Sequence, residues 1–131
     1  MSARPFPAVD LLVVAAGGAC GALLRHGIDV VAPDTLLPWA TLAINVVGAF
    51  VLGVLPAFAV LGRSHRLALA LGPGLLGGFT TVSAWAGQVR ELAATGHAAT
   101  AGLYLALTLG AGLSAAALGH RVAHPLRGAV R

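Results

Sequence analysis

The sequence predicts an all-α integral membrane protein with four transmembrane helices. Its 131 residues are 58% hydrophobic and 9% charged, and the mean hydropathy is +0.91. A soluble domain carries roughly 25% charged residues, so this chain has too little charge to cover a water-facing surface. Four long apolar stretches follow one another with short loops between them, and each approaches the ~20 residues that cross a bilayer. We therefore expect one membrane domain over residues 1–131, in the cell membrane and in contact with lipid.

The four spans follow in order along the chain. The first has its apolar core from Leu11 to Leu24 and continues past Arg25. Because this run lacks a clear cleavage site, we expect a retained helix and not a signal peptide. The later spans are separated by the short sequences VAPDT, RSHR and RELAATGH. The expected boundaries are 9–31, 36–62, 67–93 and 98–119.

The arginines predict the orientation of these spans. An even number of spans places both termini on one side of the membrane. That side holds six arginines, which are Arg4, Arg63, Arg66, Arg121, Arg127 and Arg131, whereas the other side holds Arg25 and Arg90. Cytoplasmic loops carry an excess of basic residues, so we expect both termini in the cytoplasm. Because the basic residues are dispersed and not interleaved with aromatics, nucleic acid is not an expected partner.

The first span carries small residues on one face. Gly17 and Gly21 are four residues apart, as are Gly18 and Ala22, and together they form a smooth ridge that lets another backbone come close. Arg25 follows this ridge near the end of the span. It either extends to the membrane surface or finds a partner inside the bundle, such as a free carbonyl or the region of Asn45.

Polar side chains line one face of the second span and one face of the fourth. Thr41, Asn45 and Gly48 share a face by helical spacing. A buried asparagine amide needs partners, so Asn45 either makes an interhelical hydrogen bond or lines a polar path. On the fourth span, Tyr104 and Thr108 are four residues apart. Tyr104 is either an interfacial anchor or a buried hydroxyl, and its position well inside the span favours the second.

The third span contains GLLGGFTTVSAW at residues 74–85, which is unsuited to a continuous helix. Non-helical backbone survives at membrane depth only when it is buried in protein or lines a wet cavity. A break frees carbonyls, which bind cations, and amides, which favour anions. Gly77 and Gly78 allow unusual dihedral angles. Three hydroxyl residues follow, one of which can cap the restarted helix: Thr80, Thr81 and Ser83. We expect a third helix broken mid-membrane, with a flexible glycine-rich helix without a site as the alternative.

The sequence offers no recognisable catalytic machinery. The cores of the expected spans contain no Asp, Glu or Lys, and the five histidines lie at or outside the span ends. We find no nucleophile with an adjacent base, so we do not expect an enzyme. Proton-coupled exporters typically need a carboxylate inside the membrane, and its absence from the expected span cores argues against such a transporter.

Three motifs in this order resemble the CrcB/Fluc family of fluoride channels. They are GGACGALLR at 17–25, TLAINVVGAFVLG at 41–53 and GLLGGFTTVS at 74–83. Each motif is weak by itself, but the three together in a four-span chain of this length are specific. The resemblance covers about Val13 to Gly119.

The resemblance implies a passive channel that lets fluoride leave the cytoplasm and so lowers its toxicity. It implies an antiparallel dimer with two fluoride pathways and a structural sodium ion at its centre. By motif position, the sodium ligands are the backbone carbonyls of Gly77 and Thr80. The expected pathway residues are Thr41, Asn45, Thr81, Ser83, Trp85, Tyr104 and Thr108. The expected packing residues are Gly17, Gly18, Gly21, Arg25, Gly48 and Gly78.

The third motif departs from the usual family pattern, which is TTFS followed by a further aromatic. Val82 replaces the first phenylalanine and has no aromatic edge to offer an anion, whereas Trp85 stands at the second position and adds an indole N–H. Together with the arginine bias, this predicts one half of an antiparallel heterodimer with a related chain of opposite orientation; a homodimer stays open. The alternatives are a non-conducting structural subunit and a small multidrug-type transporter, whose expected membrane glutamate is missing.

Overall fold

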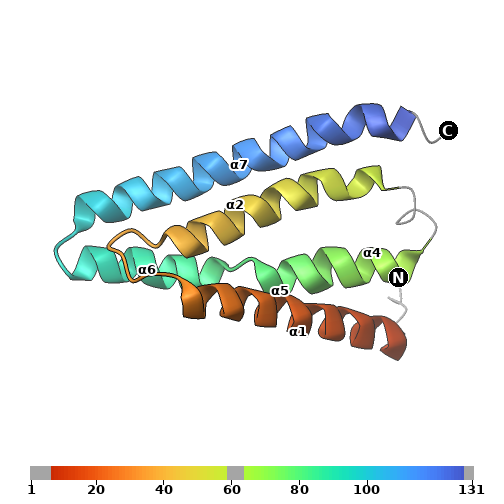
Figure 1. The fold of residues 1–131 in the computed structure, drawn as a ribbon, viewed down its shortest axis with the longest axis horizontal. Helices are drawn as coiled ribbons and strands as arrows, with labels where there is room; N and C mark the ends of the chain where they lie inside the picture. Colours follow the sequence, from red (N-terminus) through yellow and green to blue (C-terminus); the bar gives the residue numbers. More distant parts are fainter. Residues whose placement is uncertain (1–6, 59–63, 129–131) are drawn as a thin grey trace, which may run out of the picture.

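The structure, a computed structural model, describes residues 7–58 and 64–128, with the side chains of 125–128 left out. The described residues are helical with short connections (Figure 1). The helices are α1 (Ala8–Val31), α2 (Trp39–Val54), η1 (Leu55–Ala57), α4 (His65–Leu69), η2 (Ala70–Leu76), α5 (Gly77–Phe79), α6 (Val82–Ala94) and α7 (Ala98–Gly128).

Four stretches are long and apolar enough to cross a membrane, which confirms the expected all-helical, four-span architecture. They are Ala8–Val31, Trp39–Ala57, His65–Ala94 and Ala98–His124. The second begins at Trp39, three residues later than expected, because Pro38 directly precedes the helix. Before it the chain turns, and Thr35 Oγ1 donates to the Leu37 carbonyl at 2.7 Å. The expected end of this span at residue 62 lies outside the described residues.

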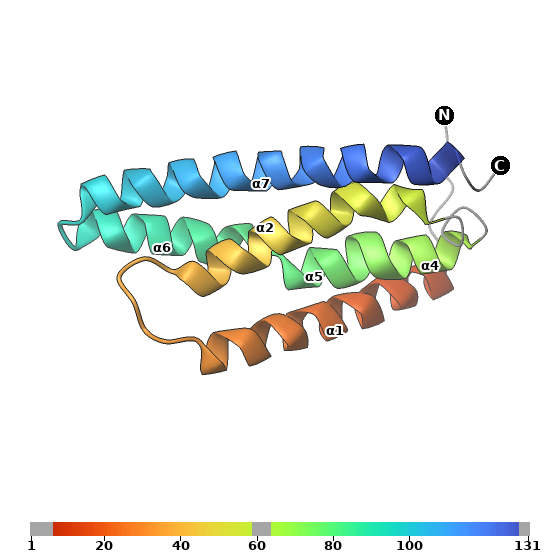
Figure 2. The ribbon, with the colours of Figure 1, turned by 45° about the horizontal axis from the view of Figure 1, so that its top comes forward.

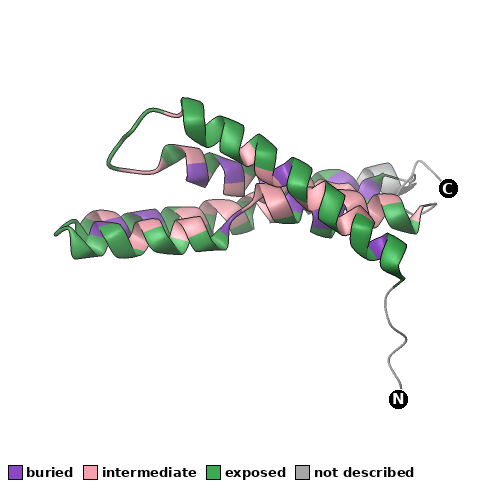
Figure 3. Cartoon of the chain, turned by 90° about the horizontal axis from the view of Figure 1, so that it is seen from below, coloured by how far each residue is buried: buried purple, intermediate pink, exposed green. Residues whose placement is uncertain are grey.

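The helices form two pairs joined through the third segment. α1 packs on η2 and α5, whereas α2 packs on α7, and α6 also lies against α7. The start of α1 and the end of α7 lie at the same end of the molecule (Figures 1 and 2). Buried residues lie where these elements meet, and the outer faces are exposed (Figure 3). These outer faces carry large apolar side chains, such as Leu12 and Leu113, as expected of a surface that lipid covers.

The glycine ridge on α1 brings two backbones together, as predicted. A Cβ at Gly21 would overlap the Leu75 carbonyl, and a Cβ at Gly17 would overlap a carbonyl of η2. From the other side, a Cβ at Gly78 would overlap the Gly18 carbonyl. No side chain separates α1 from the third segment at these points, so the contact fixes where η2 and α5 lie.

An ionic contact joins the start of α1 to the start of α4. Asp10 is 7% exposed; Arg66 Nε donates to its Oδ1 at 3.4 Å, and His65 Nε2 lies 3.5 Å from its Oδ2. Ser64 caps α4 by accepting a hydrogen bond from the Leu67 amide. Both basic side chains are mostly exposed, so this contact adds little to stability beside the backbone packing of the glycine ridge.

Candidate functional site

The third segment departs from the α-helical pattern at two places. It leaves the α-helical pattern at η2, a π-helical stretch that contains Pro73, and π-type turns are frequent at functional sites. The helix then ends at Phe79. Thr80 has φ −75° and ψ 156°, and Thr81 has φ −146° and ψ 118°, so both residues are extended. The ribbon narrows to this link between α5 and α6 before α6 begins at Val82 (Figure 1).

Thr81 begins the restarted helix. Its Oγ1 accepts a hydrogen bond from the Ala84 amide at 3.1 Å, and the same oxygen lies 3.3 Å from Ser83 Oγ. Thr80 behaves differently, because its Oγ1 donates back to the Leu76 carbonyl at 2.9 Å. Of the three hydroxyl residues Thr80, Thr81 and Ser83, Thr81 is therefore the cap of α6, and it is buried.

Asn45 reaches from α2 to the backbone of the extended link. Its Nδ2 donates to the Thr81 carbonyl at 3.0 Å, and its Oδ1 accepts from the Thr81 amide at 2.8 Å. The side-chain amide thus pairs with Thr81 as a neighbouring strand would. Nδ2 carries a second hydrogen, and Asn45 also lines a cavity, so the interhelical bond and the polar path are compatible at this residue.

The side chains of Asn45 and Thr81 each accept a hydrogen bond from a backbone amide that would otherwise donate to a carbonyl of the helix. In a continuous α-helix, the Thr81 amide would donate to the Gly77 carbonyl and the Ala84 amide to the Thr80 carbonyl. Here the first amide turns to Asn45 Oδ1 and the second to Thr81 Oγ1. The carbonyls of Gly77 and Thr80, three residues apart in the sequence, are left without these donors. Unwound carbonyls of this kind suit a hard cation.

Arg25 also binds the third segment. Its Nε donates to the Gly78 carbonyl at 3.4 Å, and its Nη1 lies 3.8 Å from Asp29 Oδ2. Gly78 is where the backbone of α5 meets Gly18 of the ridge, so the guanidinium lies beside the closest approach of α1 and α5. This confirms the interpretation in which Arg25 finds a carbonyl partner inside the bundle.

A second polar cluster joins α2, α6 and α7. Gln88 Nε2 donates to Thr41 Oγ1 at 2.9 Å, and the hydroxyl of Tyr104 donates to Gln88 Oε1 at 2.8 Å. Tyr104 is 0% exposed, so it is a buried hydroxyl and not an interfacial anchor. Gln88 was not among the residues predicted from the sequence. Its position seven residues after Thr81, two turns along the same helix face, is the signal that could have found it.

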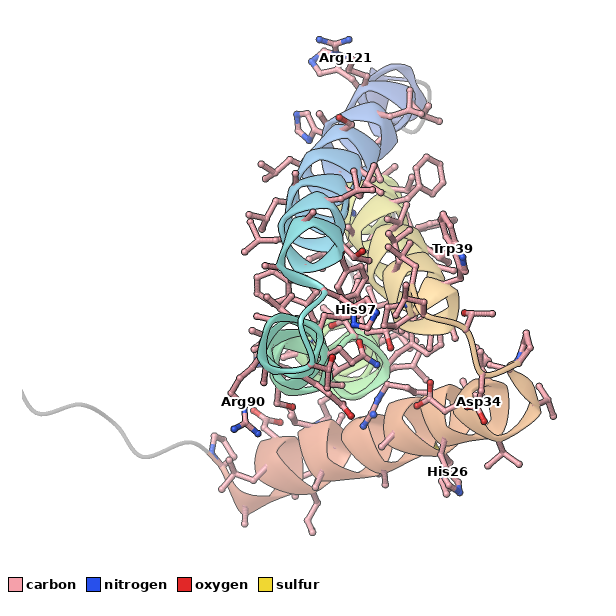
Figure 4. All side chains as sticks on the ribbon, turned by 90° about the vertical axis from the view of Figure 1, so that its left-hand side faces the viewer. His26, Asp34, Trp39, Arg90, His97 and Arg121 are labelled. Atoms are coloured by element: carbon pink, nitrogen blue, oxygen red, sulfur yellow. The ribbon has the colours of Figure 1, made fainter. Side chains whose placement is uncertain are left out.

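Two cavities touch these clusters on neighbouring turns of α2. The first, of about 680 Å³, is lined by Thr41 and Gln88 and opens among the helix ends, where Asp34 and His97 also line it. Figure 4 faces this end, with His97 toward the middle. The second, of about 450 Å³, is mostly apolar and has Asn45 in its wall, one turn beyond Thr41. The two cavities therefore lie along one face of α2 from the helix ends to the break.

The wall of the second cavity carries unpaired hydrogen-bond donors. Among the described residues, two buried side-chain polar atoms have no partner: Trp85 Nε1 and Thr108 Oγ1. Both residues line this cavity, as does Val82, which is 76% exposed and has no polar side-chain atom. An indole N–H can only donate, so the group that satisfies Trp85 Nε1 would have to be an acceptor. A buried unpaired donor is costly, and its retention calls for a ligand or a water.

The fold and this site define a four-span membrane protein whose third segment is interrupted at Thr80 and Thr81, beside a cavity with unpaired polar side chains in its wall. Comparison with known proteins identifies its family. The family described as "CrcB-like protein, Camphor Resistance (CrcB)" matches residues 12–120, and the chain belongs to this family.

Relatives in this family carry the name of a channel. The chain is 40% identical over 114 residues to "Fluoride-specific ion channel FluC" of Hyphomonas neptunium, covering 82% of this chain and 90% of the relative. It is 41% identical over 131 residues to "Fluoride-specific ion channel FluC 2" of Nocardia farcinica, covering 97% of this chain and 94% of the relative. The resemblance stated from the three motifs is thereby confirmed.

Proposed function

We propose that this chain is a subunit of a fluoride-selective channel that lets fluoride leave the cytoplasm passively. The names of the relatives support fluoride as the permeant ion. The observation that carries the proposal is the interruption at Thr80 and Thr81, which leaves two carbonyls without helical donors and lies beside a cavity whose lining residues include two with unpaired polar atoms. Fluoride is small and strongly hydrated, so a pathway must replace its water with donors.

The proposed path follows α2. Fluoride enters the larger cavity and meets Thr41, whose hydroxyl is held by the Gln88 amide. One turn deeper it meets the second N–H of Asn45. Tyr104 shares Gln88 with Thr41 and keeps its amide in one orientation.

Beyond Asn45, the path enters the apolar cavity at the break. The donors there are the indole N–H of Trp85 and the hydroxyl of Thr108, both unpaired in the described residues. The hydroxyls of Thr81 and Ser83 lie 3.3 Å apart at the start of α6, where the positive end of the helix dipole favours an anion. Apolar walls with a few convergent donors strip water from the ion and replace it selectively.

A structural sodium ion fits the carbonyls of Gly77 and Thr80, because both have lost their helical donors and offer oxygen to a hard cation. One chain provides two such oxygens, which is few for a cation, and Gly77 is exposed. An antiparallel second copy or related chain placed against this face would supply two more. The bound ion would supply a fixed positive charge that lowers the cost of an anion nearby. We place both termini in the cytoplasm on the arginine bias.

A second candidate is one half of a heterodimeric channel, with one pathway impaired. Val82 favours it, because this exposed position at the mouth of the apolar cavity presents no donor and no aromatic edge. The arginine bias of six against two also favours a chain that inserts in one orientation. In this arrangement a related chain of opposite orientation provides the opposing face.

Fluoride efflux from liposomes tests the proposal. The chain is purified alone, reconstituted with trapped potassium fluoride, and efflux is read with a fluoride electrode against a chloride background. Rapid efflux that chloride does not inhibit supports a self-pairing channel. Efflux that appears only after a related chain of opposite orientation is added supports the heterodimer. A stable complex that releases no fluoride in either case contradicts the channel proposal and favours a structural subunit.

A further inference from the structure

Asn45 on α2 makes two hydrogen bonds to Thr81 on the third segment. These bonds also affect the Gly77 carbonyl, which would be the helical acceptor of the Thr81 amide. The paired atoms are Asn45 Oδ1 with the Thr81 amide at 2.8 Å and Asn45 Nδ2 with the Thr81 carbonyl at 3.0 Å. Thr81 is buried and extended. Its amide is the group that a continuous helix would direct to the Gly77 carbonyl. Asn45 therefore competes with the Gly77 carbonyl for the same N–H.

The surroundings allow the break to close when this competition is lost. The Thr80 amide still donates to the Leu76 carbonyl at 2.9 Å, so the α-helical pattern reaches the residue before Thr81. A helical bond from the Thr81 amide to Gly77 would require the ψ angle of Thr80, which is 156°, to take a helical value. A buried amide without an acceptor is unfavourable, so removing Asn45 Oδ1 drives the Thr81 amide toward the nearest free carbonyl.

We infer that Asn45 is a positioning residue for the cation site: by holding the Thr81 peptide, it keeps the Gly77 carbonyl available to sodium. This inference rests on the proposed channel function and its sodium site. It gives Asn45 a task in addition to its place in the fluoride path. The residue that donates to the anion on α2 also prepares the ligand of the cation on the third segment.

If Asn45 positions the cation site, two substitutions at this residue should differ in their effect on sodium binding. Asn45→Leu keeps the approximate volume and removes both hydrogen bonds. Asn45→Asp keeps an oxygen that accepts from the Thr81 amide, whether or not the new carboxyl is protonated. If Asn45 acts through Thr81, only the leucine variant weakens sodium binding. If Asn45 serves the anion alone, the leucine variant binds sodium as the wild type does.

The experiment measures sodium-dependent thermal stability in detergent, with N-methylglucamine replacing sodium at constant ionic strength. A ligand that binds the folded state raises the unfolding temperature with its concentration. We expect the wild-type midpoint to rise with sodium. Asn45→Leu should need at least about tenfold more sodium for the same rise, whereas Asn45→Asp should need no more than the wild type. Thr41→Val, a path variant that does not touch the break, should need the same sodium concentration as the wild type for the same rise, although its own midpoint is lower because Gln88 Nε2 loses its acceptor.

Hydrogen exchange of the Thr81 amide gives a readout that needs no bound metal. Asn45 protects this amide in the wild type, and Asn45→Asp should retain that protection. In sodium-free buffer, Asn45→Leu should either expose the amide or return it to a helical bond, and in both cases its exchange rate changes. If Asn45→Leu does not yield folded protein, Asn45→Ser takes its place, because serine is too short to reach both backbone groups of Thr81.

The outcomes distinguish this inference from the channel proposal when wild-type fluoride efflux is measured in parallel. An identical sodium titration for Asn45→Leu and wild type overturns the role of Asn45 and leaves the cation site intact. A wild type that conducts fluoride without any sodium-dependent shift overturns the inference together with the sodium site, but not the channel. A folded wild type that neither conducts nor responds to sodium contradicts the proposed function itself.

Discussion

The two halves of the third segment are held in place by different means. Before the break, η2 and α5 lie against α1 through glycines, and backbone touches backbone. After the break, α6 is held through side chains: Gln88 reaches Thr41 on α2, and Tyr104 on α7 reaches Gln88. A small apolar cluster around Leu92 and Tyr104 supports these bonds.

The difference shows how one apolar segment serves two purposes. Close backbone packing has no adjustable side chain between its partners, so it fixes the position of the first half and of the carbonyls at its end. Side-chain contacts leave room between the helices after the break, and both cavities lie beside α6. We therefore expect substitutions before the break to change stability most, and substitutions after it to change fluoride transport most.

The largest expected effect on stability comes from Gly21→Ala. The new methyl would overlap the Leu75 carbonyl, and a backbone partner cannot rotate away. Overpacking of this kind costs roughly 1–3 kcal/mol, which exceeds the approximately 1 kcal/mol that alanine gains over glycine in a helix. We expect a lower thermal midpoint in detergent and less monodisperse protein on size-exclusion chromatography.

Gly27→Ala in the same helix is the matched control for this substitution. A Cβ at Gly27 would meet no described atom within 4 Å. The gain in helix propensity should then leave the thermal midpoint unchanged or slightly raised. If the Gly21 and Gly27 variants unfold at the same temperature, backbone contact does not fix the first half, and the comparison fails.

Gln88→Leu should affect both stability and transport. Leucine has a similar volume, but it leaves the fully buried Tyr104 hydroxyl without its acceptor and frees the Thr41 hydroxyl. An unsatisfied buried group costs about 1–3 kcal/mol. Fluoride efflux should fall at least about tenfold, which corresponds to ~1.4 kcal/mol of lost stabilisation along the path.

Gln88→Glu controls for shape, because its carboxyl oxygens accept hydrogen bonds from both Tyr104 and Thr41. We expect this variant to keep the thermal midpoint of the wild type within a few degrees, since about 1 kcal/mol shifts a small domain by roughly 4–8 °C. A leucine variant as stable as the wild type would show that the Gln88 hydrogen bonds do not hold α6 in place.

Much of this organisation could be predicted from local sequence. The apolar stretches predict four helices, the spacing of Gly17 and Gly21 predicts a close backbone contact, and the run of glycine and threonine predicts where the third helix is interrupted. These features repeat at helical spacing or depend on residues next to one another. They need no knowledge of which segments pack together.

The pairings between segments could not be predicted in the same way. Asn45 and Thr81 are separated by 36 residues, and Thr41 and Gln88 by 47. Many polar residues could satisfy a buried asparagine or glutamine equally well, and only the packing of α2 against the third segment selects these partners. The contact of Asp10 with His65 and Arg66 escaped prediction for the same reason, although these three residues lie at expected helix ends.

Trp85→Phe is expected to change stability least of these substitutions. It therefore gives the sharpest separation of an effect on fluoride transport from an effect on stability. Phenylalanine keeps an aromatic ring against the Tyr104 cluster and removes the N–H that has no partner among the described residues. The lost ring area and the removed orphan donor act in opposite directions, so the thermal midpoint should change by the equivalent of less than about 1 kcal/mol. Fluoride efflux should nevertheless fall about tenfold. Of the two unpaired groups, Trp85 Nε1 and Thr108 Oγ1, only the Thr108 hydroxyl then remains. Leu113→Ala, at a residue of α7 that is 73% exposed and lines neither cavity, should leave efflux unchanged. Wild-type efflux from the Trp85 variant would mean that a water, and not fluoride, satisfies the indole, and that the region after the break carries ions without it.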